Sequence, residues 1–90
     1  MRKEYIKRKV YEMLREVESP NYFGPINENE TIGEIFGLTP ERGNEFLVSL
    51  KIVELTVGLE NNLRIAIEKD YRNILRMRLK DFVDYVFYLA

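Results

Sequence analysis

The strongest constraint on the fold is the concentration of turn-forming residues in one part of the chain. All three prolines and four of the five glycines lie between residues 20 and 44. Proline cannot donate a backbone hydrogen bond and disfavours helical geometry in the residue before it, so this stretch cannot form one long helix. We therefore expect a long connection, held to the core by the apolar residues Ile32, Ile35, Phe36 and Leu38.

The segments on either side of this connection have helical periodicity. Apolar residues spaced by three and four predict a first helix over 2–18 and a second over 45–62. An extended connector is expected at 63–67, then a short third helix at 70–77 and a final amphipathic helix. The apolar positions are Ile6, Val10, Met13, Leu14 and Val17 in the first helix, Phe46, Leu50, Val53, Val57 and Leu59 in the second, and Leu79, Phe82, Val83, Val86 and Phe87 in the last.

The length and composition favour one small domain over residues 1–90. Splitting 90 residues would leave each part too little core to offset its conformational entropy. The expected fold is an all-α four-helix bundle with a long loop between helices 1 and 2 and a short third helix. No apolar run approaches a membrane span and the chain has no cysteine, so we expect a cytoplasmic monomer without disulfides.

Catalysis by the chain itself is not expected. Without His or Cys, the remaining acid-base candidates are Asp, Glu, Lys and Tyr, and no thiolate can bind a metal or act as a nucleophile. Asp81 and Asp84 lie on one predicted helix without an obvious partner base. The sequence therefore predicts neither an enzyme nor a metal site.

Charge is distributed unevenly along a chain whose formal net charge is -1. Residues 10–60 contain ten acidic and three basic side chains, whereas residues 1–9 and 61–90 each carry a net positive charge. An acidic middle would repel phosphates and no nucleic-acid motif is present, so we expect no nucleic-acid partner. The aromatic side chains of the final helix follow a helix face and are interpreted as packing residues; they are Phe82, Tyr85, Phe87 and Tyr88.

Four segments resemble acyl carrier proteins in family order. Residues 49–60, SLKIVELTVGLE, are similar to the Ser-Leu-x-x-Val-Glu-Leu-x-x-x-Leu-Glu run that opens the family's second helix. Residues 65–67, IAI, and 81–86, DFVDYV, look like its Ile-x-Ile connector and its closing helix. Upstream, residues 31–37, TIGEIFG, resemble the family's segment before the modified serine. Together the matches span most of the chain from residue 31 onward.

The resemblance implies a carrier function centred on Ser49. In the family this serine bears a covalent 4'-phosphopantetheine arm, which a phosphopantetheinyl transferase attaches from coenzyme A and which carries acyl groups as thioesters. The implied role is delivery of acyl intermediates in fatty acid, lipid or polyketide synthesis. The implied partners, besides the transferase, are acyl-loading and acyl-processing enzymes with basic docking surfaces. The residues at the family's partner-binding positions are Leu50, Val53, Glu54, Val57, Glu60 and Ile67.

The sequence also departs from the family. Val48 stands where the family has Asp immediately before the modified serine, which implies an adapted transferase, weaker modification, or no modification. The inserted segment 38–44 contains two typical helix starts, Thr39-Pro40 and Asn44, which would leave Ser49 inside the helix. The alternative function is an unmodified carrier-fold adaptor that binds partner proteins through the second helix. Without the resemblance, Ser49 would be interpreted as a small packing residue and Glu54 as a solvated position.

Overall fold

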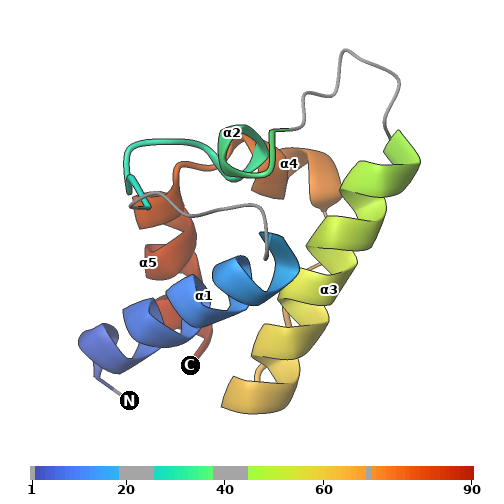
Figure 1. The fold of residues 1–90 in the computed structure, drawn as a ribbon. Helices are drawn as coiled ribbons and strands as arrows, with labels where there is room; N and C mark the ends of the chain where they lie inside the picture. Colours follow the sequence, from blue (N-terminus) through green and yellow to red (C-terminus); the bar gives the residue numbers. More distant parts are fainter. Residues whose placement is uncertain (1, 19–25, 38–44, 69) are drawn as a thin grey trace.

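The described residues form five helices (Figure 1). The computed structural model describes residues 2–18, 26–37, 45–68 and 70–90, with the side chains of these residues except 18 and 45–49. The helices are α1 (Lys3–Glu18), α2 (Ile32–Ile35), α3 (Glu45–Leu63), α4 (Tyr71–Arg76) and α5 (Leu79–Leu89). Within the described residues there is no strand, and one isolated bridge joins Thr31 to Arg78. The predicted helical order, the extended connector and the all-α class are confirmed.

The connection before α3 differs from the prediction because it contains a helix of one turn, α2. Thr31 caps this helix: its Oγ1 accepts a hydrogen bond from the Glu34 backbone N–H and donates one to Glu34 Oε1, both at 3.1 Å. Gly37 follows the helix with a φ of +67°, a conformation that glycine adopts at little cost. The pattern Thr-x-x-Glu followed by glycine therefore explains a helix inside a segment that periodicity alone predicts as a loop.

Three backbone hydrogen bonds tie this connection to the joint between α4 and α5. The N–H of Ile32 donates to the Met77 carbonyl at 2.9 Å, and the N–H of Leu79 donates to the Glu30 carbonyl at 2.8 Å. Lys80 adds a third, to the carbonyl of Glu28 at 3.0 Å. We call this pairing of residues 28–32 with 77–80 the strap. The strap fixes irregular backbone against the bundle and keeps α2 beside α4.

One apolar cluster fills the space between the helices. Three of the four predicted loop anchors, Ile32, Ile35 and Phe36, are buried in it, whereas Leu38 lies outside the described residues. Of the apolar positions predicted in α3, Leu59 is buried, whereas Leu50 and Val57 are exposed, as their match to the family's docking positions implies. The buried residues of the long helices are Ile6, Val10 and Leu14 in α1, Ile52, Leu55, Leu59 and Leu63 in α3, and Leu79, Phe82, Val83 and Val86 in α5.

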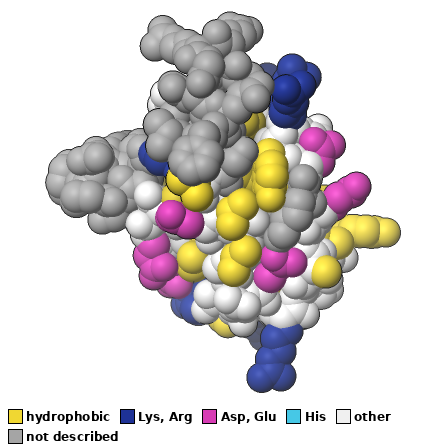
Figure 2. Space-filling model, turned by 90° about the vertical axis from the view of Figure 1, so that its right-hand side faces the viewer, with side chains coloured by type: hydrophobic (Ala, Val, Ile, Leu, Met, Phe, Trp, Pro, Cys, Tyr) yellow, Lys and Arg dark blue, Asp and Glu magenta, His cyan; other side chains and the backbone are white. Residues whose placement is uncertain are grey.

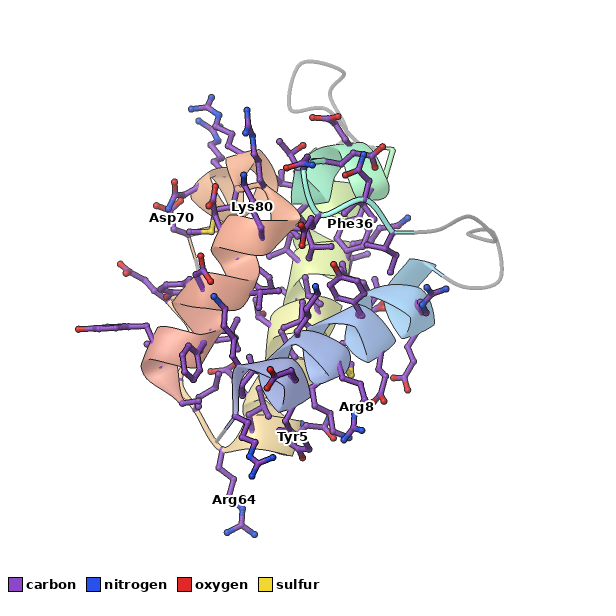
Figure 3. All side chains as sticks on the ribbon, turned by 90° about the vertical axis from the view of Figure 1, so that its left-hand side faces the viewer. Tyr5, Arg8, Phe36, Arg64, Asp70 and Lys80 are labelled. Carbon is purple, nitrogen blue, oxygen red and sulfur yellow. The ribbon has the colours of Figure 1, made fainter. Side chains whose placement is uncertain are left out.

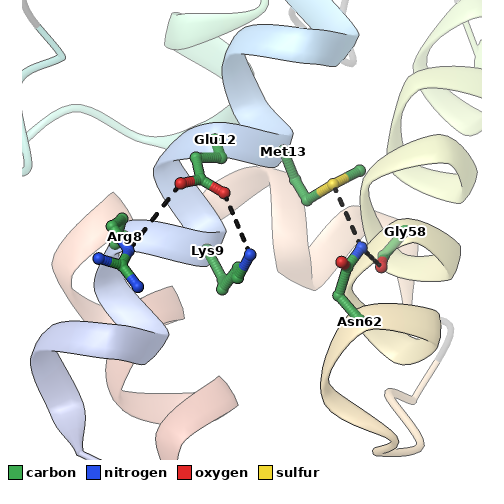
Figure 4. A network of polar contacts seen from close by, with 6 residues as sticks. All are labelled: Arg8, Lys9, Glu12, Met13, Gly58 and Asn62. Carbon is green, nitrogen blue, oxygen red and sulfur yellow. Dashed lines mark hydrogen bonds and ion pairs between the residues drawn. The ribbon is translucent and has the colours of Figure 1, made fainter.

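The apolar spacing of α3 does not identify its core face. Helix α3 has apolar residues on both sides, so its spacing does not distinguish a core face from an exposed face. Helix α3 packs against α1. At Gly58 the terminal methyl group of Met13 occupies the space that a Cβ would fill, so the flexible Met13 side chain packs directly on the α3 backbone. Asn62 adds polar contacts there, donating to the Gly58 carbonyl at 2.7 Å and to Met13 Sδ at 3.8 Å (Figure 4).

The aromatic residues of α5 divide between core and solvent. Phe82 is buried and its ring lies 6.5 Å from that of Tyr85, as the packing interpretation predicts. Phe87 and Tyr88 are exposed, with 39% and 86% of their surface accessible, so that interpretation is wrong for them. The reason is their position around the helix. The buried side of α5 contains Leu79, Phe82, Val83 and Val86, and the next two residues after Val86 lie on other sides of the helix.

These environments predict different effects for the same substitution on one helix. Phe82→Ala removes a fully buried ring and leaves a cavity, so we expect it to lower the free energy of unfolding by about 3–5 kcal/mol. The control Phe87→Ala removes a partly exposed ring and is expected to cost about 1 kcal/mol or less. Urea denaturation followed by circular dichroism measures both. Equal losses would contradict the orientation of α5.

Candidate functional site

Ser49 lies one turn inside α3. It is the fifth residue of a helix that begins at Glu45, so the prediction that the helix starts ahead of the serine is confirmed. The inserted segment 38–44 and the side chains of Val48 and Ser49 lie outside what the structure describes. By register, position 49 precedes Val53 by one turn and Glu60 by three. Both Val53 and Glu60 are half-buried.

An apolar stripe runs along the exposed face of α3. It consists of Leu50 and Val57, which are 44% and 40% exposed, with half-buried Val53 between them. The three residues follow each other at intervals of three and four, so they share one side of the helix. Figure 2 looks onto this face and shows a run of hydrophobic side chains with acidic side chains on both sides of it. We call these three residues the α3 stripe.

The two predicted docking glutamates have different environments. Glu54 is exposed beside the stripe. Glu60 is half-buried and its Oε2 accepts a hydrogen bond from the Ile67 backbone N–H at 3.1 Å. The carboxylate of Glu60 therefore holds the connector after α3 in place. A sequence pattern cannot show this, because the donor is a backbone group seven residues away.

Ile67 does not belong to the exposed surface. Its side chain is 4% exposed and forms part of the core, which corrects its expected position on a docking face. The extended connector turns it inward, and the Tyr85 hydroxyl accepts the N–H of the next residue, Glu68, at 3.3 Å. From the sequence alone, an apolar residue after an exposed stripe could belong either to the docking surface or to the core. Tertiary packing places Ile67 in the core.

A cation lies close to the first turns of α3. Lys51 is half-buried, and its Nζ lies 5.5 Å from the centre of the Phe36 ring, at the end of α2. This cation–π contact links α2 to α3. The sequence shows Lys51 as a basic residue at a position that is commonly acidic in carrier proteins. The structure shows that its charge faces α2 and not the centre of the α3 stripe.

The described residues form no metal site. No group of three or more His, Cys, Asp or Glu side chains is placed among them to hold a metal ion. Asp84 is exposed and pairs with Lys3 at 2.6 Å, which gives it a role in joining α5 to α1. None of the described helices combines the length and hydrophobicity needed to cross a bilayer.

Among the described residues, small surface cavities lie away from the α3 stripe. One, of about 90 Å³, is between α1 and α5 and is bordered by the ion pairs Lys3–Asp84 and Lys7–Glu28. Another, of about 60 Å³, lies beside Tyr85. A third, of about 230 Å³, is an open hollow beside Glu4 on α1. All three are smaller than the roughly 300–1,000 Å³ typical of ligand pockets. Of the described surface, the exposed face of α3 is therefore the better candidate for a functional site.

Comparison with known proteins gives no assignment: no family model, curated protein or solved structure matches the chain.

The different environments of Glu54 and Glu60 lead to a stability prediction. Glu60→Ala removes the acceptor of the Ile67 N–H, so we expect it to lower the free energy of unfolding by about 1–2 kcal/mol. Glu54→Ala, the matched control on the same helix, is expected to change it by less than about 0.5 kcal/mol. Chemical denaturation compares the two. A larger loss at Glu54 would contradict the structural role of Glu60.

Proposed function

We propose that this protein is an acyl carrier protein that bears 4'-phosphopantetheine on Ser49 and delivers acyl intermediates in fatty acid, lipid or polyketide synthesis. One observation carries the proposal: the family-like run SLKIVELTVGLE, residues 49–60, lies on α3, and α3 buries one face while leaving the other exposed. Three residues at the family's docking positions, Leu50, Glu54 and Val57, are exposed there. The sequence resemblance and the solvent exposure are independent lines of support for one surface.

The helical arrangement is consistent with this role. The order of the helices is the one that the resemblance to acyl carrier proteins implies. A long first helix is followed by a long connection, a second long helix that begins near the serine, a short helix and a closing helix. The one-turn helix α2 lies within the connection and packs against α4. This order supports the finer description of the fold as an acyl-carrier-type four-helix bundle in which α2 is an additional turn.

The place of Ser49 along α3 is relevant to attachment of the arm. Ser49 lies one turn after the first residue of α3, and the unpaired backbone N–H groups and positive dipole end that favour a phosphate belong to that first turn. When attached, the arm would supply the thiol that a chain without cysteine lacks.

The α3 stripe and Glu54 would carry partner recognition. Leu50, Val53 and Val57 offer small apolar contacts that set the register of a partner. Glu54 offers a carboxylate to a basic docking surface and steers its approach. Glu60 would act indirectly by holding the connector, and Ile67 by filling the core. The proposed docking surface is therefore smaller than the sequence alone predicts.

The second candidate is an adaptor of the same fold that is never modified. Val48, in place of the family's Asp before the serine, is the observation that favours it. The adaptor would use the same α3 stripe to bind a protein partner, so the two functions differ in the chemistry at Ser49 and not in the surface. Modification is therefore the measurement that separates them.

Incubation with coenzyme A, Mg²⁺ and a broad-specificity phosphopantetheinyl transferase is expected to add one phosphopantetheine unit to the wild-type protein. Ser49→Ala removes the acceptor hydroxyl and is expected to abolish the gain while helicity is kept. Intact mass spectrometry and peptide mapping measure the outcome. Val48→Asp restores the family's residue and should speed labelling. If neither wild type nor Val48→Asp gains mass, the adaptor is favoured.

Glu54→Lys tests the docking surface without altering the acceptor. Reversing this charge should slow transfer of the arm to Ser49 by about 3- to 10-fold at low salt, because it removes attraction to a basic partner. The effect should shrink as added salt screens the charges. Initial labelling rates measure it. Glu16→Lys makes the same charge change on α1, and equal slowing there would remove Glu54 from the surface.

A further inference from the structure

The side chain of Met13 completes the contact between α1 and α3. Its terminal methyl group occupies the space that a Cβ at Gly58 would fill, and its Sδ lies 3.2 Å from that same position. Figure 4 shows the Met13 side chain pointing from α1 toward Gly58 and Asn62 of α3. At this point the contact consists of a thioether that lies directly against helix backbone.

The sulfur atom lies at the edge of the core. Met13 is half-buried and packs against the core cluster from outside, and its neighbour Asn62 is exposed. The Nδ2 of Asn62 donates to Met13 Sδ at 3.8 Å and to the Gly58 carbonyl at 2.7 Å. Because a thioether is a weak acceptor, the carbonyl holds this amide more strongly than the sulfur does. An oxygen atom added to the sulfur would be a stronger acceptor beside the same N–H group.

The cations of α1 nearest to this sulfur are engaged with other groups. Lys9 precedes the methionine by one turn, and its Nζ pairs with Glu12 at 3.4 Å. Arg8 pairs with the other oxygen of Glu12 at 3.9 Å (Figure 4). Figure 3 shows the labelled Arg8 close to the labelled Tyr5, whose ring centre lies 5.4 Å from the guanidinium. The donor that already contacts the sulfur is therefore Asn62 of α3.

We propose that Met13 is a site of reversible oxidation, and that its conversion to the sulfoxide loosens the packing of α1 on α3. With hydrogen peroxide, a lone pair of the sulfur attacks one peroxide oxygen. The S–O bond forms and the O–O bond breaks. The second oxygen takes the proton of the first and leaves as water, so that the sulfur loses two electrons and the peroxide gains them.

The reverse step needs an external reductant. A methionine sulfoxide reductase returns the sulfoxide to the thioether with two thiols, which form a disulfide, and the oxygen leaves as water. The chain itself has no cysteine, so these thiols belong to the reductase or to a thiol reagent.

The added oxygen does not fit the present packing. A sulfoxide is polar where the thioether is apolar, and the space beside Gly58 is already filled to contact distance. An oxygen turned toward the Asn62 amide moves the methyl group off the α3 backbone. Oxidation thereby weakens an apolar contact between the two long helices. This inference goes beyond the carrier proposal and does not depend on modification of Ser49, because it concerns the contact between α1 and α3 alone.

Treatment of the folded protein with hydrogen peroxide tests the proposal. We expect peptide mapping by mass spectrometry to locate one added oxygen on Met13. Thermal unfolding followed by circular dichroism should show a melting temperature lowered by about 4–8 °C, as expected for a weakened packing contact in a domain of this size. Incubation with a methionine sulfoxide reductase and dithiothreitol should restore both the mass and the melting temperature.

Three variants separate this effect from general oxidative damage. Met13→Leu keeps the apolar volume without a sulfur, so its melting temperature should not respond to peroxide. Met77→Leu is the matched control, because Met77 is the other methionine among the described residues and is also half-buried; this variant should keep the full response. Met13→Gln introduces a polar group at the same site and should lower the melting temperature without peroxide.

Three results would overturn the proposal. One is that Met13 gains no oxygen under conditions that oxidise free methionine. Another is that Met13 is oxidised without a change in melting temperature. The third is that peroxide lowers the melting temperature of Met13→Leu as much as that of the wild type.

Discussion

The rest of the structure depends on the pairing of residues 28–32 with 77–80. These residues have little regular structure of their own, yet three backbone hydrogen bonds between them join the connection after α1 to the joint before α5. The pairing satisfies polar groups that would otherwise be costly beside the core. It also places Ile32 and Ile35 in the core and keeps α2 beside α4. These backbone hydrogen bonds thereby hold the irregular connection in place although it contains no regular strand.

The division of α3 into two faces gives the protein its candidate functional surface. One face contributes Ile52, Leu55 and Leu59 to the core, and buried Thr56 satisfies its hydroxyl by donating to the Ile52 carbonyl at 2.8 Å. The other face keeps Leu50 and Val57 exposed. Because the helix is anchored by its buried face, the exposed side chains are presented on a rigid element, which is the arrangement that a docking surface requires. The carrier and adaptor functions would both use this face.

The near-zero net charge conceals an uneven distribution of charge over the surface. The exposed face of α3 carries Glu54 beside the apolar stripe. Residues 72–80, in and after α4, carry the exposed cations Arg72, Arg76, Arg78 and Lys80. Basic and acidic partners would consequently meet different parts of the surface.

The sequence by itself determined the helical segments, the breaks between them and the chemistry that the chain lacks, because periodicity, proline and glycine positions and the absence of Cys and His are local properties. Tertiary structure decided which side of each helix is buried. Helix α3 is apolar on both sides, and its packing against α1 and α4 accompanies the burial of Leu59 and the exposure of Val57. Long-range contacts likewise decided that Glu60 holds the connector and that Ile67 is buried, since their partners are brought near only when the chain folds.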